Sequence, residues 1–125
     1  MSLPILEKWN NIINTGNVKH LDEIIHEKAK FFSPVVYTPQ IGKEIVVKYL
    51  STAVKVFKGK NFIYINKIIE NNNIFAEFSA TIDNIEINGI DLMRLENSLI
   101  IEFRVFIRPI KGLEKVWSEM RKNLN

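Results

Sequence analysis

The stretch that decides the fold is NGIDLMRLENSLIIEFRVFIRP, from Asn88 to Pro109. Side chains along a β-strand point alternately to opposite faces of a sheet. The alternation here predicts two long antiparallel strands joined by a tight turn at Glu96-Asn97-Ser98. In the first strand, Asp91 shares its face with Met93 and Leu95. A carboxylate therefore falls on the apolar face, which is the sharpest functional signal in the chain.

The second strand of this hairpin repeats the pattern. Its apolar face is expected to carry Leu99, Phe103, Val105 and Ile107, with Ile101 between them. The opposite face of the hairpin places charged residues around Phe106: Arg94, Glu96, Glu102, Arg104 and Arg108. Because interfaces favour arginine and aromatic residues, we expect this outer face to be a dimer interface or a solvated surface.

The composition fits one globular domain, which is expected to span residues 1–125. Hydrophobic residues make up 46% and charged residues 25% of the chain, close to the averages for soluble domains. The net charge of +3 comes from scattered lysines and arginines, so no nucleic-acid partner is expected. The absence of cysteine excludes disulfides, thiolate nucleophiles and Cys-ligated zinc. Neither a signal peptide nor a spanning segment is recognised, so we expect a cytoplasmic protein with no membrane partner.

Two helices are expected to open the chain. Pro4 suits a first helical turn and Gly16 suits a left-handed cap, so the first helix should end at Thr15. Its apolar stripe consists of Ile5, Leu6, Trp9, Ile12 and Ile13. Asn17 is expected to cap a second, short helix, whose inward residues are Val18, Leu21, Ile24 and Ile25.

A short strand from Ala29 to Ser33 and an irregular segment at 34–39 should follow, because prolines bracket the latter. The longest helix is expected from Lys43 to Phe57, where apolar residues recur at the helical period.

From Phe62 onward the chain reads as strand. Residues 62–70 and 74–82 are expected to be strands separated by a turn at 71–73, and Asp83-Asn84 forms either a second turn or a bulge. A C-terminal helix should follow Pro109. Helices segregated from an antiparallel sheet define an α+β fold. The expected architecture is a cone-shaped, curved antiparallel sheet wrapped around the long helix, with a cavity at one end.

Four short motifs occur in order along the chain: Ser33-Pro34, Gly42-Lys43, GIDLMRLEN at 89–97, and Arg108-Pro109. Together with the order of elements, they make the chain resemble the nuclear transport factor 2-like superfamily, and within it the SnoaL-like and ketosteroid-isomerase-like group. The resemblance covers essentially the whole chain. It implies a homodimer formed through the outer sheet face and an apolar pocket between sheet and helices. The fold hosts isomerases, cyclases, dehydratases, hydrolases and non-enzymatic binders, so it leaves the function open.

The resemblance carries over residue by residue. In ketosteroid isomerases an aspartate just before the strand proline is the general base, and that position here is Ser33. A tyrosine of the first helix donates to the developing oxyanion, and the matching residue is Trp9, whose indole N–H is also a donor. The second donor is an aspartate, retained here as Asp91. Burial would raise the pKa of an unpaired Asp91 and let it donate to a ligand carbonyl. The serine at the base position argues against the isomerase reaction itself.

The predicted pocket lining is Trp9, Phe31, Ser33, Tyr37, Tyr49, Phe78, Asp91, Met93, Phe103 and Val105. Asp91 is the candidate acid or hydrogen-bond donor, or else it pairs with a cation or a backbone group at the rim. Trp9 is either ligand-facing or plain core, and Tyr37 lines the entrance or belongs to an ordinary loop. His26 is a candidate proton shuttle or a helix-end residue. No ligand set for a metal is present in the sequence, so we expect neither a metal nor a cofactor.

Three functions from different classes fit these features. The first is an enzyme acting on a small, mostly apolar molecule that carries a carbonyl or hydroxyl group, by isomerisation, cyclisation or dehydration. The second is a non-catalytic binder that uses the same pocket. The third is a dimeric interaction module whose sheet face recruits another protein.

Overall fold

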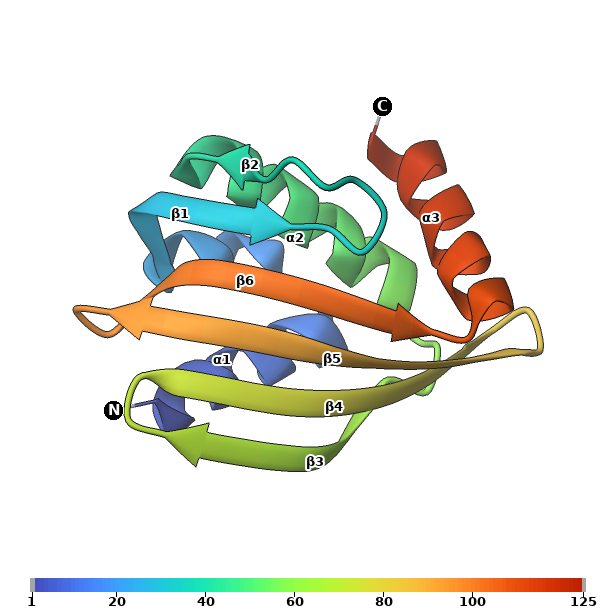
Figure 1. Cartoon of the computed structure of the whole chain (residues 1–125), viewed down its shortest axis with the longest axis horizontal. Helices are drawn as coiled ribbons and strands as arrows, with labels where there is room; N and C mark the ends of the chain where they lie inside the picture. The colour runs from blue at the N-terminus through green and yellow to red at the C-terminus, as the bar shows by residue number, and fades with distance from the viewer. Residues whose placement is uncertain (1, 125) are drawn as a thin grey trace.

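The computed structural model describes residues 2–124, which form one curved six-stranded sheet with helices packed against one of its faces (Figure 1). The helices are α1 (Leu3–Thr15), the 3-10 helix η1 (Val18–Glu23), α2 (Lys43–Phe57) and α3 (Ile110–Leu124). The strands are β1 (Ile25–Phe32), β2 (Gln40–Ile41), β3 (Ile63–Glu70), β4 (Asn73–Ile82), β5 (Ile85–Glu96) and β6 (Leu99–Arg108). Within residues 2–124, no helix has the length and apolar character needed to cross a membrane.

The strand order across the sheet is β2-β1-β6-β5-β4-β3. Neighbouring strands are antiparallel, except that β1 and β6 run parallel. The expected α+β cone is therefore confirmed, with one parallel pair that the sequence did not indicate. The order places the hairpin of β5 and β6 at the middle of the sheet, where both of its strands have a partner on each side.

The helix boundaries follow local signals. Helix α2 has the predicted bounds, and α1 ends at Thr15, where Gly16 adopts a φ of 76° and donates its N–H to the Ile12 carbonyl at 2.8 Å. The second helix is a 3-10 helix, and the Asn17 side chain makes no capping hydrogen bond. The prediction that Ile25 belongs to this helix is wrong, because β1 begins there, four residues before the predicted start.

The β5–β6 hairpin confirms the tight turn and corrects one predicted face. Asn97 and Ser98 form the turn with φ of 53° and 63°. The pairing changes from Arg94↔Glu102 to Leu95↔Ile100, so β6 contains one extra residue. Such a β-bulge reverses the alternation of side chains. Ile100 is consequently fully buried and Leu99 only half-buried, whereas the regular pattern had placed Leu99 inward.

The open question at Asp83-Asn84 is resolved as a two-residue turn between β4 and β5. Both residues have positive φ, 50° and 65°. This backbone geometry is typical of tight hairpin turns, whose twist matches that of the flanking strands. The β4–β5 pairing accordingly runs without interruption from Ile82↔Ile85 to Asn73↔Arg94.

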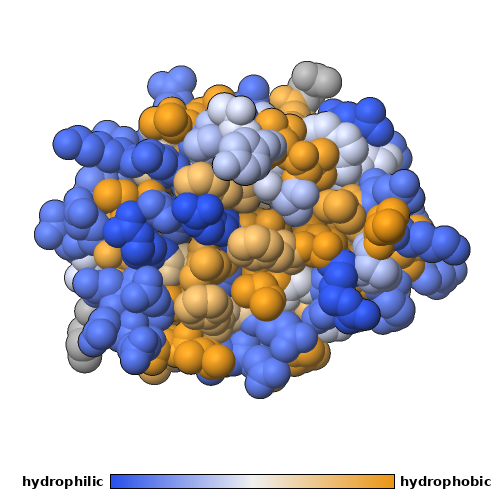
Figure 2. Space-filling model, viewed as in Figure 1, coloured by the Kyte–Doolittle hydropathy of each residue, from blue (hydrophilic) through white to orange (hydrophobic). Residues whose placement is uncertain are grey.

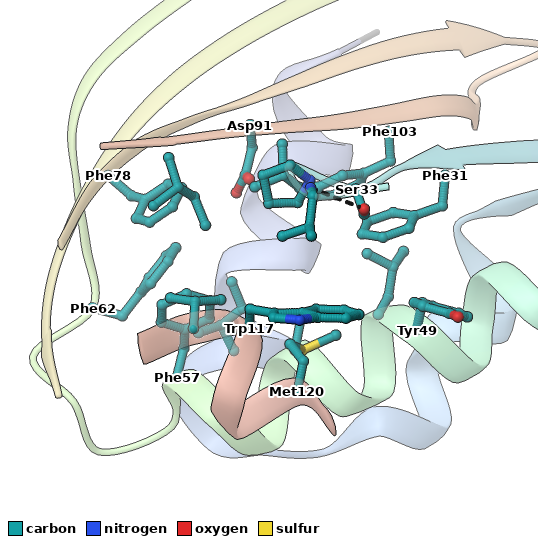
Figure 3. Close-up of a pocket in the computed structure, with 18 of the residues that line it drawn as sticks. Phe31, Ser33, Tyr49, Phe57, Phe62, Phe78, Asp91, Phe103, Trp117 and Met120 are labelled. Atoms are coloured by element: carbon teal, nitrogen blue, oxygen red, sulfur yellow. Dashed lines mark hydrogen bonds between the residues drawn. The ribbon is translucent and has the colours of Figure 1, made fainter. Parts of the chain in front are cut away.

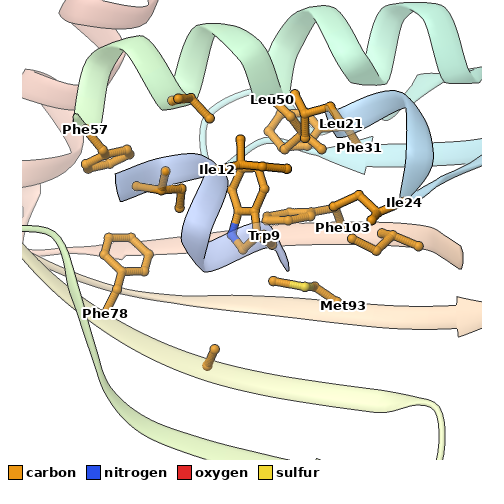
Figure 4. Close-up of a cluster of buried hydrophobic side chains, with 14 of the residues drawn as sticks. Trp9, Ile12, Leu21, Ile24, Phe31, Leu50, Phe57, Phe78, Met93 and Phe103 are labelled. Atoms are coloured by element: carbon orange, nitrogen blue, oxygen red, sulfur yellow. The ribbon is translucent and has the colours of Figure 1, made fainter. Parts of the chain in front are cut away.

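The core lies between the concave face of the sheet and helices α1 and α2 (Figure 4). Trp9 of α1 is buried and meets Phe103 of β6 edge-on, with ring centroids 5.2 Å apart. Helix α3 packs on α2 and on the ends of β5 and β6, and buries Val116 and Met120. Trp9 therefore belongs to the core and, as shown below, also to the wall of a pocket.

Strand β5 packs so closely against its neighbours that no side chain fits at Gly89. A Cβ atom at this position would lie 2.5 Å from the Phe106 carbonyl oxygen and would overlap the Phe78 ring. We expect Gly89→Ala to lower the free energy of unfolding by about 1–3 kcal/mol, the usual cost of overpacking. Chemical denaturation measures this change, and the exposed Glu86→Ala on the same strand is the control. Equal stability of the two variants would contradict the packing described here.

Candidate functional site

A pocket opens between the sheet, α2 and α3 at the end of the cone away from the β5–β6 turn (Figure 3). The cavity volume is about 50 Å³. The lining residues are Trp9, Ile13, Phe31, Ser33, Pro34, Val35, Tyr49, Leu50, Ala53, Phe57, Phe62, Phe78, Asp91, Phe103, Val105, Ile107, Val116, Trp117 and Met120. Most are apolar, and Asp91 is the one acidic or basic side chain among these described residues.

Asp91 reaches the pocket from the middle of β5. It is 4% exposed. Its cross-strand partners are Ala76 and Val105, which surround it with apolar groups. One carboxylate oxygen, Oδ2, accepts a hydrogen bond of 2.5 Å from the Tyr64 hydroxyl. The Tyr64 oxygen in turn accepts a bond of 2.7 Å from the Trp9 indole N–H. Asp91 is thus held by a neutral donor, the Tyr64 hydroxyl, rather than by a cation at the rim.

The electrostatics of Asp91 follow from this setting. Burial raises the pKa of Asp91 from its ordinary 3.8 to about 7, even though the Tyr64 hydroxyl and the Trp9 indole N–H favour the ionised form. Desolvation dominates because an apolar pocket cannot replace the hydration of a carboxylate. Near neutral pH, the protonated and ionised forms of Asp91 are therefore both populated.

Ser33 has a structural task in the loop that follows β1. Its Oγ accepts the backbone N–H of Val35 at 3.2 Å and that of Val36 at 2.8 Å. Side-chain bonds of this kind shape turns. The turn leads Pro34 and Val35 along the pocket rim. Ser33 thus serves the turn, and no histidine is present among the described pocket residues to activate it as a nucleophile.

Eight of the ten residues predicted for the pocket lie along it. The two exceptions are Tyr37 and Met93. Tyr37 is 98% exposed, because the turn at Ser33 leaves it on the outside of the loop. Met93 is fully buried in the apolar cluster beside Phe103 (Figure 4), deeper in the cone than the pocket. Trp9 lies on the wall, but its N–H is already bonded to Tyr64.

Sequence reasoning missed Tyr64 and did not assign Trp117 and Met120 to the pocket. Tyr64 lies on β3, two residues after the buried Phe62, which is the spacing of residues that share one face. That spacing was the available signal for a hydroxyl turned toward the core. Trp117 and Met120 were predicted as the apolar stripe of the last helix, but nothing in the sequence indicated which part of the sheet this helix would cover.

His26 lies away from the pocket. Its Nε2 is 3.3 Å from a Glu96 carboxylate oxygen, and its Nδ1 accepts the backbone N–H of Lys28 at 2.9 Å. Both ring nitrogens are thus occupied at the start of β1. Among residues 2–124, no group of three or more His, Cys, Asp or Glu side chains is arranged to hold a metal ion.

Comparison with solved structures places this geometry among known relatives. One similar protein is a steroid delta-isomerase from Pseudomonas aeruginosa, whose crystal structure superposes on this chain with a TM-score of 0.90. The two sequences are 30% identical, and the match covers 97% of this chain and 89% of the isomerase chain. A protein with a cystatin-like fold from Silicibacter pomeroyi is 23% identical, covers 95% of this chain and 84% of its own, and has a TM-score of 0.86. The second likeness supports the fold alone.

No curated protein matches the sequence with significance. The family model described as the SnoaL-like domain matches residues 6–103. This range includes Asp91, Tyr64 and Trp9 but ends before α3. On this match and on the likeness to the steroid delta-isomerase, the chain belongs to the SnoaL-like domain family, within the nuclear transport factor 2-like superfamily.

Proposed function

We propose that the pocket binds a small, mostly apolar molecule carrying a carbonyl or hydroxyl group, on which Asp91 acts as the acid or hydrogen-bond donor. The observation that carries this proposal is a single buried carboxyl group in a pocket whose other walls are largely apolar. A pocket of this kind binds through its apolar surface and orients its ligand through a few polar groups. The likeness to a steroid delta-isomerase supports the same class of ligand.

The chemistry that Asp91 supports is proton donation to oxygen. In its neutral form the carboxyl group can donate to a carbonyl oxygen as negative charge develops there, which stabilises an enol-like intermediate. In its ionised form it can accept a proton from a neighbouring carbon or hydroxyl group. With a pKa of about 7, Asp91 is able to do both near neutral pH. Isomerisation, cyclisation and dehydration all pass through such steps.

The size of the pocket limits the ligand. A cavity needs a volume of about 10–15 Å³ to hold one water molecule. The cavity volume of 50 Å³ therefore corresponds to a few water molecules. Trp117 and Met120 of α3 form the wall opposite Asp91 in Figure 3. We therefore propose a compact ligand, such as a one- or two-ring compound, accommodated by movement of these two side chains.

A second candidate function is non-catalytic binding. The observation that favours it is Ser33, which stands at the position of the general base and whose oxygen accepts two backbone N–H groups. The residue that removes a proton in ketosteroid isomerases thus has no counterpart at this position. Under this alternative, Asp91 would orient a bound ligand without transferring a proton.

We also propose a homodimer formed through the outer face of the sheet. One cross-strand row runs Ile68, Phe75, Leu92, Arg104 and Phe32. The Arg104 guanidinium lies 3.6 Å from the centroid of the Phe32 ring. Beside this row, Ile90 and Phe106 are paired and are 39% and 54% exposed. Figure 2 shows apolar surface gathered over the middle of the sheet with hydrophilic residues around it, which is the usual layout of an interface.

The proposed role of Asp91 predicts an effect on catalysis. We expect Asp91→Asn to reduce turnover of a small β,γ-unsaturated cyclic ketone by about 10²–10⁴-fold, because the amide keeps the shape but cannot supply a proton. Ultraviolet absorbance of the conjugated product measures the rate. Normal turnover by the variant would refute the role of Asp91.

Binding is measured in parallel through quenching of tryptophan fluorescence, since both tryptophans of the chain, Trp9 and Trp117, line the pocket. Exposed Tyr37→Phe is the control and should bind as the wild type does. If small cyclic ketones bind the wild type without turnover, the non-catalytic alternative replaces the enzymatic one. If none binds, the ligand class proposed here is wrong.

The burial of Asp91 predicts that stability depends on pH. Because the folded-state pKa of Asp91 is about 7 and its ordinary value is 3.8, the folded protein binds more protons than the unfolded chain between these values. The free energy of unfolding therefore falls as the pH rises through this window. Relative to Asp91→Asn, we expect the wild type to lose on the order of 3 kcal/mol between about pH 4 and pH 8.

Chemical denaturation at several pH values measures this difference. The control is Asp83→Asn, because a hydrogen bond from Lys115 lowers the pKa of the exposed Asp83. Asp83 is thus ionised in both folded and unfolded chains above about pH 5. The difference in free energy of unfolding between Asp83→Asn and the wild type should therefore not change with pH in that range. If the difference in free energy of unfolding between the wild type and Asp91→Asn does not change with pH, the Asp91 carboxyl group is not desolvated.

The proposed interface predicts a dimer in solution. We expect the wild type to have the mass of two 14.6 kDa chains in analytical ultracentrifugation, and Phe106→Arg to have the mass of one, because it places a charge in the apolar face. The control is Ile110→Arg, which changes a residue that is 75% exposed at the start of α3. A monomeric wild type would refute this interface.

A further inference from the structure

Three side chains from three different elements form a chain of two hydrogen bonds. The donor of each bond follows from the chemistry of the groups. Trp9 of α1 donates its indole N–H to the Tyr64 oxygen at 2.7 Å. Tyr64 of β3 lies 2.5 Å from Asp91 Oδ2 of β5. An indole N–H can only donate, whereas a phenol has one proton to donate. The first bond therefore has only one possible direction.

The direction of the second bond follows from the first. In the described structure, the Tyr64 hydroxyl has Trp9 as its donor and Asp91 as its acceptor. If Asp91 carried its proton on Oδ2 and donated it to Tyr64, the phenolic proton would lose this acceptor. Leaving a buried hydroxyl without an acceptor is unfavourable. Oδ2 thus accepts a hydrogen bond from the Tyr64 hydroxyl in both charge states of Asp91.

Tyr64 keeps its proton throughout the working range of pH. Its side chain is half-buried, and its hydroxyl end lies inside the protein. Burial raises the pKa of Tyr64 well above its ordinary value of 10, and the neighbouring Asp91 raises it further. The pocket residues facing Asp91 from α2, α3 and β6 include one other titratable group, the Tyr49 phenol. No lysine, arginine or histidine among the described pocket residues competes for the carboxyl group.

We infer that Tyr64 is a positioning residue that, oriented by Trp9, confines the carboxyl proton of Asp91 to Oδ1 and so directs it toward a ligand in the pocket. The inference rests on the proposed function, since it names the atom that would donate to the ligand. Figure 3 shows the Asp91 carboxyl group pointing from β5 into the space bounded by Phe78, Trp117 and Tyr49. Tyr64 is not among the residues that line this space. It acts through Asp91 rather than on the ligand.

The first test is a titration of Asp91 in the full chain. The chain contains three aspartates, Asp22, Asp83 and Asp91, so ¹³C-labelling of the aspartate carboxyl groups gives three NMR signals, and Asp91→Asn assigns the third. We expect Tyr64→Phe to raise the pKa of Asp91 by about one to two units, because a donor to the ionised form is lost. Trp9→Phe should raise it by less.

A double variant distinguishes two arrangements. In the first, Trp9 acts on Asp91 through the Tyr64 hydroxyl, and in the second, Trp9 and Tyr64 donate to Asp91 independently. Trp9 also favours the ionised form of Asp91, and we ascribe this effect to the Tyr64 hydroxyl, with which its N–H is bonded. If that is correct, Trp9→Phe should add nothing once Tyr64 is replaced by phenylalanine. Additive shifts would mean that Trp9 donates to Asp91 directly, and would overturn the inference.

Matched controls come from the same pocket. Tyr49→Phe removes a phenol that lies outside this hydrogen-bond chain, and Trp117→Phe removes an indole on the opposite wall. We expect the pKa of Asp91 to change less in both than in Tyr64→Phe. A shift as large in Tyr49→Phe as in Tyr64→Phe would contradict the role assigned to Tyr64.

The second test needs no variant and therefore does not depend on the folding of one. A crystal structure of the wild type at atomic resolution and about pH 5, below the pKa of Asp91, resolves the two carboxyl bond lengths. The protonated oxygen has the longer bond to Cγ, so we expect Cγ–Oδ1 to exceed Cγ–Oδ2. The opposite order would overturn the inference. Neither test uses a ligand, so each outcome is independent of whether small cyclic ketones bind or react.

Discussion

The pairing of β5 with β4 on one side and β6 on the other is the constraint on which the rest of the molecule depends. Because hydrogen bonds satisfy β5 along both edges, its side chains must alternate between the two faces of the sheet. Asp91 is thereby carried into the interior with Met93 and Leu95, against the preference of a carboxylate for water. The sheet imposes this position, and the surroundings adapt to it.

The residues that accommodate the buried Asp91 include Gly89 as well as Tyr64. Tyr64, Phe78 and Gly89 lie in one cross-strand row, two residues along β5 from Asp91. The Phe78 ring occupies the space that a side chain at position 89 would fill. Phe78 thus packs tightly against β5, while the Tyr64 hydroxyl reaches Asp91. Burial in these apolar surroundings leaves the carboxyl group poorly solvated, and this is why it keeps a proton to unusually high pH although Tyr64 donates to it.

The pocket combines a shared part with a part that lies outside the family match. Residues 6–103 match the SnoaL-like domain and supply Asp91, Trp9 and the aromatic wall. Helix α3 lies beyond this range, yet it contributes Val116, Trp117 and Met120 to the wall opposite the acid. Under the proposed function, the residue that donates to the ligand and the residues proposed to limit ligand size therefore come from different parts of the chain.

The sequence alone determined the α+β class, the bounds of α2, the turn of the central hairpin and the inward position of Asp91. These features depend on periodicity and turn residues within a few positions of one another. The tertiary structure decided the bulge near Ile101, the contact of Tyr64 with Asp91 across 27 residues, and the placement of Trp117 over the pocket. Each of these depends on which distant segments meet, and alternation within one strand carries no information about the depth, register or partner of another.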